Sequence, residues 1–65
     1  MFFEFTTTKN EPVSININKI LCITPYKKGS LIVDVEGMDY YSNEEYTALV
    51  QRLNDYACKT YKKCN

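Results

Sequence analysis

Few side chains in this chain of 65 residues could carry out chemistry, and their spacing does not match a catalytic arrangement. Histidine, the usual general base near neutral pH, is absent. Glu44 and Glu45 are adjacent, but they stand at the start of a predicted helix, where solvated acids are expected. Gly29 and Gly37 fall in predicted turns and not in a phosphate-binding loop. We therefore expect a protein without enzymatic activity and without a cofactor.

The chain has three cysteines, an odd number that cannot form a complete set of disulfides. Cys22 lies in an apolar run and is expected to be a small buried side chain. Cys58 and Cys64 are six residues apart, which places them on different faces of a helix. We expect three free thiols in a reducing cytoplasm, with a Cys58–Cys64 disulfide as the alternative. Without histidine or a C-x-x-C pair, no zinc or other metal site is expected.

The net charge argues against a general affinity for nucleic acids or membranes. Eight basic and eight acidic residues cancel, whereas proteins that bind nucleic acids usually carry a basic excess. Only one of the basic residues is an arginine, Arg52. No apolar run approaches the ~18 residues of a membrane span. The absence of a basic, apolar start also argues against a signal peptide.

The hydrophobic pattern predicts a single α+β domain over residues 1–65. Strands are expected at 1–8, 13–17, 20–23 and 31–36, with a short further piece at 39–41. A turn at 16–19 separates the second strand from the third, and a hairpin at 26–30 offers Gly29 for positive φ. The expected architecture is a small antiparallel β-sheet of three to four strands with one C-terminal helix packed on one face.

The final helix is expected from about residue 43 to 58, with a possible extension to 62. Ser42 and Glu45 have the spacing of a capping box. Asp55 and Lys59 are spaced as an i, i+4 ion pair. One apolar stripe predicts the face that packs on the sheet, and its residues are Tyr46, Leu49, Val50, Leu53 and Ala57.

The strand at 31–36 alternates in a way that predicts its buried side. Its aliphatic face carries Leu31, Val33 and Val35. The opposite face carries Ile32, Asp34 and Glu36, and we expect it to be mostly exposed to water.

A protein interface is expected on the sheet face that the helix leaves open. This face is expected to carry Ile32 and one of each aromatic pair in Phe2/Phe3 and Tyr40/Tyr41, and exposed apolar patches commonly bind partners. The first strand is a predicted edge strand whose free backbone groups could pair with a second copy. We therefore expect a homodimer or a complex with another protein. The alternative is a monomer whose N-terminal strand covers the second face. The candidate interface residues are Phe2, Phe3, Phe5, Ile32, Tyr40 and Tyr41.

Nucleic-acid binding is the alternative function. Lysines and tyrosines gather at the hairpin and at the C-terminal end, and together they could form a basic platform on which bases stack. This requires the two groups to lie on one face of the molecule. The residues concerned are Tyr26, Lys27, Lys28, Lys59, Tyr61, Lys62 and Lys63.

Residues 14–53 resemble the FlbD family of small flagellum-associated bacterial proteins. The resemblance lies in the asparagine turn and isoleucine at 16–20, the turn glycine Gly37, and the helix at 42–53. The same stretch also resembles the first half of LytTR-type DNA-binding domains, although the strand loops here lack arginine and histidine and the strand MFFEF is additional. The resemblance implies a small cytoplasmic protein from a bacterium or a phage.

Overall fold

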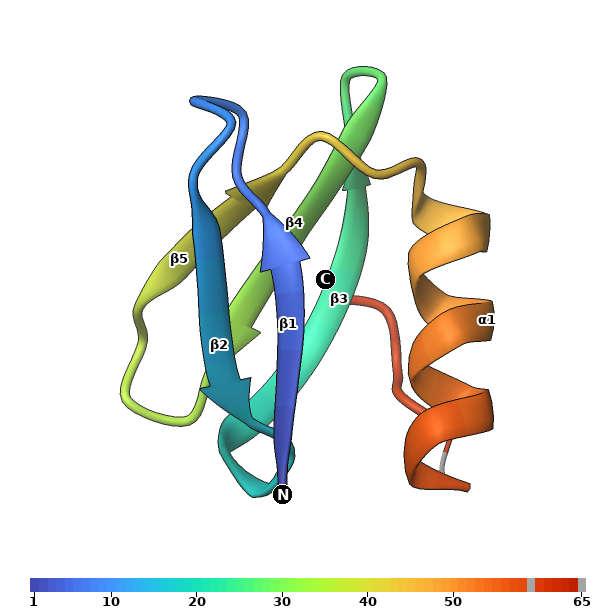
Figure 1. Ribbon diagram of the computed structural model, residues 1–65. Coiled ribbons are helices and arrows are strands. Elements are labelled where there is room, and N and C mark those ends of the chain that lie inside the picture. Colours follow the sequence, from blue (N-terminus) through green and yellow to red (C-terminus); the bar gives the residue numbers. More distant parts are fainter. Residues whose placement is uncertain (59, 65) are drawn as a thin grey trace.

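The computed structural model describes residues 1–58 and 60–64. Within this part of the chain, five strands and a single 3-10 turn precede one α-helix (Figure 1). The elements are β1 (Phe2–Thr6), β2 (Pro12–Asn16), η1 (Ile17–Lys19), β3 (Ile20–Tyr26), β4 (Gly29–Asp34), β5 (Asp39–Ser42) and α1 (Tyr46–Ala57).

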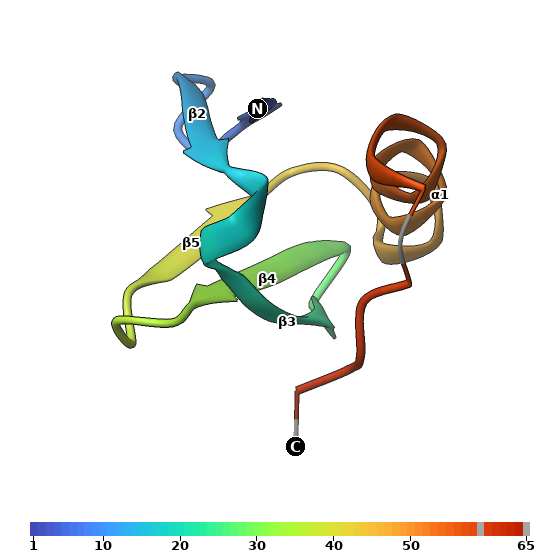
Figure 2. The same cartoon turned by 90° about the horizontal axis from the view of Figure 1, so that it is seen from below.

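The strands form two antiparallel sheets, where one sheet was predicted. β1 and β2 make a hairpin, and β3, β4 and β5 make a three-stranded sheet in sequence order. The two are joined at one corner, where Thr7 bridges Ser42 and the Thr8 N–H donates to the Tyr41 carbonyl at 3.0 Å. Figure 2 shows the hairpin and α1 together on one side of the three-stranded sheet. The predicted α+β class, with an antiparallel sheet and a helix near the C-terminus, is confirmed.

The core lies between the hairpin, the three-stranded sheet and α1. The helix stripe packs as predicted, because Leu49 and Leu53 are fully buried and its other members are partly buried against the core. Burying each leucine contributes about 1.5–3 kcal/mol. The buried apolar residues of the core cluster are Phe3, Phe5, Ile15, Ile20, Ile23, Ile32, Leu49, Leu53 and Tyr61.

The helix begins later than predicted, and a different residue caps it. The Glu45 side chain accepts a hydrogen bond from the Ala48 N–H at 3.1 Å, so Glu45 is the N-cap. Ser42 is buried at the end of β5, paired with Ser30, and its hydroxyl accepts from the Glu44 N–H at 3.0 Å. The first helical residue is Tyr46, four positions after Ser42, so Ser42 is not the N-cap and the predicted capping box is wrong.

The turns are confirmed in position but not in every detail. Asn16 caps η1, since its side-chain oxygen accepts from the Asn18 N–H at 2.9 Å. In the β3–β4 hairpin the positive φ belongs to Lys27, at 52°. Gly29 is needed for a different reason: a Cβ at this position would collide with the backbone carbonyl of Ser42.

The predicted inner and outer faces of β4 are reversed. Ile32 and Asp34 are buried, whereas Val35 is 57% exposed and Leu31 and Val33 are half-buried. Asp34 can be buried because its Oδ1 accepts from the N–H groups of Glu36 and Met38, both at 2.9 Å. Buried polar groups are tolerated when they are hydrogen-bonded in this way.

The C-terminal segment corrects the prediction of three free thiols. Residues 60–64 do not extend the helix, which ends at Ala57 with Cys58 in the left-handed conformation at φ 52°. The segment runs parallel to β3, where the Ile23 N–H donates to the Lys62 carbonyl at 3.0 Å. This path brings Cys64 beside Cys22, and the two form a disulfide with Cα atoms 5.1 Å apart. Cys58 is free and exposed, so the alternative Cys58–Cys64 disulfide is also wrong.

Candidate functional site

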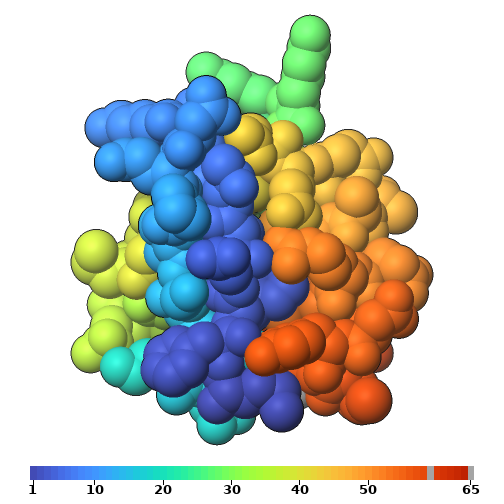
Figure 3. Space-filling model, in the orientation of Figure 1, coloured from blue at the N-terminus to red at the C-terminus, as the bar shows by residue number. Residues whose placement is uncertain are grey.

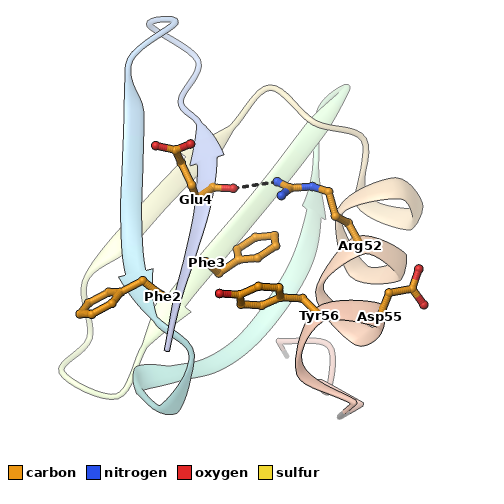
Figure 4. Close-up of a pocket in the computed structure, with 6 residues that line it drawn as sticks. All are labelled: Phe2, Phe3, Glu4, Arg52, Asp55 and Tyr56. Carbon is orange, nitrogen blue, oxygen red and sulfur yellow. Dashed lines mark hydrogen bonds between the residues drawn. The ribbon is translucent and has the colours of Figure 1, made fainter.

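A groove of about 510 Å³ lies between β1 and α1. In Figure 3 it follows the seam between the N-terminal strand in blue and the helix in orange. Figure 4 shows the Phe3 and Tyr56 rings side by side between the two elements. We call this feature the β1–α1 groove, and its lining residues are Phe2, Phe3, Glu4, Arg52, Asp55 and Tyr56.

Arg52 connects the two walls of the groove. Its Nη2 donates to the Glu4 backbone carbonyl at 2.9 Å and to Glu44 Oε1 at 2.7 Å. Its Nε donates to Glu44 Oε2 at 3.3 Å, and the guanidinium carbon lies 4.3 Å from the centre of the Phe3 ring. A planar guanidinium suits this role, since it can bond in its plane and stack on an aromatic face at once.

The backbone of β1 turns free hydrogen-bonding groups toward this groove. The Ile17 N–H donates to the Met1 carbonyl, and the Thr7 N–H donates to the Glu11 carbonyl. Since bonded positions alternate in an antiparallel pair, residues 2, 4 and 6 must direct their N–H and C=O groups away from β2. The carbonyls of Glu4 and Thr6 follow this rule, because they accept from Arg52 and from the Asn43 N–H respectively.

Four of these outward groups carry no hydrogen bond. They are the N–H and C=O of Phe2 and the N–H groups of Glu4 and Thr6, which are unpaired among residues 1–58 and 60–64. The expectation that the first strand has an open edge is therefore confirmed for its first half. The second half is closed, because Thr6 and Thr7 join β5.

The aromatic wall of the groove combines buried and accessible rings. Phe3 is buried and packs against the tilted ring of Tyr56, which is 48% exposed, with 6.2 Å between the ring centres. Phe2 is 62% exposed, and Figure 4 shows its ring on the β2 side of β1, so Phe2 contributes mainly backbone to the groove. The Glu4 and Asp55 carboxylates point away from the groove in opposite directions and form an acidic rim. This arrangement presents hydrogen-bonding and apolar surface without a nucleophile beside a base.

The side chains whose pKa values are shifted by folding lie outside the groove, and the contacts that shift them are structural. Hydrogen bonding from the Met38 N–H is the largest influence on Asp34, and together with the Glu36 N–H and the Tyr40 hydroxyl it lowers the pKa of this carboxyl despite burial. Burial raises the pKa of Tyr40, and the neighbouring Asp34 carboxylate raises it further. Burial also raises the pKa of Tyr61. Asp34 holds the β4–β5 turn together, in which Gly37 adopts φ 85°.

The residues predicted as a protein interface do not lie on one surface. Phe3, Phe5 and Ile32 belong to the core, because the β1–β2 hairpin folds over the sheet and turns both phenylalanines inward. Tyr40 is half-buried against Phe5, with 6.1 Å between ring centres. Phe2 and Tyr41 are exposed, on the hairpin and on the opposite face of the sheet. One of each aromatic pair is thus accessible, but Ile32 is not.

The predicted basic residues are only partly brought together. Lys27 and Lys28 are at the tip of the β3–β4 hairpin, and the tail runs along β3 in the direction of that tip. Lys63 pairs with Ile23, about 10 Å along β3 from Tyr26. Tyr61 is buried, and the Lys63 ammonium lies 5.5 Å from the centre of the Tyr46 ring. Tyr26 packs on Tyr41, and Lys59 lies outside the described residues, as does its predicted pair with Asp55.

Sequence reasoning missed the groove. Arg52 and Tyr56 do not belong to the apolar stripe that predicts the buried face of the helix. Their i, i+4 spacing places them on one side of the helix, next to the core stripe, and this was the available signal. Their partners on β1 depend on how the hairpin docks, which no local pattern reveals.

Comparison with protein-family models, with curated proteins and with solved structures finds no match to this chain. In the part of the chain that the structure describes, no helix has the length and apolar character needed to cross a membrane. The same residues contain no group of three or more His, Cys, Asp or Glu side chains placed to bind a metal ion.

Proposed function

We propose that the chain is a non-catalytic protein-binding module whose β1–α1 groove binds an extended segment of a partner. The observation that carries this proposal is the row of unpaired backbone groups at Phe2 and Glu4 beside the accessible ring of Tyr56. An extended peptide that adds to a strand edge gains affinity from main-chain hydrogen bonds and specificity from the side chains it inserts.

The groove also suggests the composition of the segment. An apolar side chain of the partner would cover Phe3 and Tyr56, and an N–H of the partner would take the place of Arg52 at the Glu4 carbonyl. Arg52 would keep its two hydrogen bonds to Glu44. Because Glu4 and Asp55 form an acidic rim, basic residues on either side of the apolar one would complement the charge. The bacterial or phage origin implied by the resemblance to the FlbD family is part of the same proposal. The cytoplasmic location expected with it goes against the Cys22–Cys64 disulfide, because disulfides persist mainly in oxidising compartments.

Selection of linear peptides from a displayed random library tests the proposal. Selected peptides would be synthesised with a fluorescent label and titrated by anisotropy against the wild-type chain and two variants. Glu4→Pro removes the outward N–H of residue 4, and a proline is tolerated where the strand N–H does not join the ladder. Glu4→Ala is the matched control, because it removes the same carboxylate and keeps the N–H.

We expect Glu4→Pro to weaken binding about tenfold relative to Glu4→Ala, as for the loss of one hydrogen bond. Tyr56→Ala should weaken binding further, while circular dichroism confirms that each variant is folded. Equal affinities for Glu4→Pro and Glu4→Ala would show that the backbone of β1 does not receive the peptide.

Nucleic-acid binding is the second candidate. It is supported by the run of the tail along β3 toward the hairpin tip that carries Lys27 and Lys28. Labelled single-stranded and duplex DNA in the same anisotropy assay distinguish this function, since binding to phosphates weakens steeply with salt. Strong salt-dependent binding that Lys27→Ala and Lys28→Ala abolish would favour this candidate over peptide binding.

A further inference from the structure

The three-stranded sheet has an apolar surface on the side opposite the core. Ile23, Ile32 and Tyr40 are paired across the sheet and face inward, so their neighbours along each strand face outward. Leu21, in the bulge of β3, is 48% exposed, and Tyr41 on β5 is 39% exposed. We call this surface the outer face, and its residues are Leu21, Leu31, Val33, Val35, Asp39 and Tyr41.

The chain itself leaves most of this face open. The hairpin and α1 lie on the other side of the sheet (Figure 2). The tail reaches the outer face only at its β3 edge, where Cys64 bonds to Cys22, the outward residue paired with Val33. Leu31 and Val33 of β4, with Val35 in the turn that follows, place aliphatic residues on the outer face, which is the opposite of the polar pattern of a solvated sheet face. A surface of this kind is typical of protein interfaces.

Two charges flank the apolar strip on opposite edges. Asp39 is exposed at the β5 edge, because it pairs with the outward residue Val33. Lys62 is exposed at the tail edge, and it shares the outward direction of Cys64, two residues later on an extended segment. The two lie about 14 Å apart, across three inter-strand spacings, so they do not form an ion pair within one chain.

This charge pattern is self-complementary. Consider two copies with their outer faces together, related by a two-fold axis parallel to β4. The β5 edge of each copy then lies over the tail edge of the other, so that Asp39 meets Lys62 twice. A two-fold interface always uses each contact twice in this way. A strongly acidic or basic partner would not match a face with an acid at one edge and a lysine at the other.

We infer that two copies of the chain associate through their outer faces, with Asp39 of each opposite Lys62 of the other. The sheet measures about 14 Å across its strands by about 20 Å along β4, so the contact is smaller than a standard interface. The association is therefore a weak, reversible equilibrium. The β1–α1 groove is formed by other elements and stays open in this dimer, so the dimer and peptide binding are independent.

Sedimentation equilibrium over a concentration series tests the inference. The wild-type chain should shift from monomer to dimer, and Cys58→Ser should behave identically, which excludes an intermolecular disulfide as the cause. Val33→Lys places a charge in the middle of the outer face and should abolish the dimer. Thr47→Lys, which introduces the same residue at an exposed position of α1, should leave it unchanged. Circular dichroism checks the fold of each variant.

Charge reversal tests the symmetry. Asp39→Lys and Lys62→Asp should each weaken association by about tenfold, because each turns two attractive contacts into two repulsive ones. The double variant should regain the wild-type affinity. A wild-type chain that stays monomeric to millimolar concentration, or a dimer that tolerates Val33→Lys, would overturn the outer-face dimer. A double variant as weak as the single ones would overturn the two-fold arrangement.

Discussion

Removal of the Cys22–Cys64 disulfide should remove a large part of the stability of this small domain. The bond joins residues 42 apart in the sequence. Cross-linking a loop of that length lowers the chain entropy of the unfolded state by an amount worth about 4 kcal/mol at room temperature. A domain of 65 residues has a total stability of about 3–10 kcal/mol. The loss is therefore comparable with the whole free energy of unfolding.

Urea unfolding followed by circular dichroism measures the effect. Cys64→Ser is the preferred variant, since Cys64 is only half-buried while Cys22 is buried. Cys58→Ser is the control, because this exposed thiol is outside the disulfide. The wild-type chain in a reducing agent should behave like Cys64→Ser, and Cys58→Ser like the oxidised wild type.

Hydrogen exchange adds a local readout of the same change. The Ile23 N–H bonds to the Lys62 carbonyl at 3.0 Å, so its exchange should accelerate when the tail is released. If Cys64→Ser retains the oxidised free energy of unfolding within about 1 kcal/mol, the entropic argument fails for this chain. If in addition the Ile23 amide stays protected, β3 holds the tail without the covalent bond.

Three further predictions concern the core, a close backbone contact and acid stability. Leu53→Ala should lower the free energy of unfolding by about 2–5 kcal/mol, because Leu53 is fully buried. Thr47→Ala, on the exposed side of α1, should change it by less than about 0.5 kcal/mol. Urea titrations of the two variants measure both effects. Gly29→Ala should destabilise by about 1–3 kcal/mol, since the new Cβ meets the immobile Ser42 carbonyl, and a melting temperature equal to that of the wild type would contradict this packing. Folding lowers the pKa of Asp34 from its ordinary value of 3.8, so the ionised carboxylate stabilises the folded state fully at pH values well above 3.8. This stabilisation is lost as the pH falls through 3.8 to the lower pKa of the folded state. The free energy of unfolding measured against pH should show this loss in the wild type and a flatter profile in Asp34→Asn.

Local patterns predicted those parts of the fold that depend on neighbours in the sequence. The helix stripe, the asparagine turn before β3 and the positions of the strands could be read directly, because period and turn chemistry act over a few residues. The predicted capping box is wrong, because Ser42 pairs with Ser30 at the end of β5 and the helix begins only at Tyr46. The close approach of Gly29 to Ser42 could not be seen either, since it joins positions that only sheet pairing brings together.

The reversed face of β4 shows why alternation alone can mislead. One face of the predicted strand carries three aliphatic residues, and the opposite face carries Ile32 and two acids. Hydrophobicity alone therefore favours the aliphatic face as the buried one. Asp34 decides the outcome, because the turn after β4 supplies two N–H donors and Tyr40 supplies a hydroxyl. An aspartate three residues before Gly37 is a turn signature, and it could have indicated this burial.

The helix and strands of this protein, its neutral charge and its lack of histidine follow from the sequence alone. Tertiary structure decided which side of β4 is core, that the tail returns to β3 and bonds Cys64 to Cys22, and that Arg52 spans a groove to β1. The division has one physical cause. Hydrophobic period, caps and turns act between residues that are close in the sequence. Burial, disulfide pairing and groove formation depend instead on which distant segments pack together. That packing is decided by the sum of many weak contacts across the whole chain.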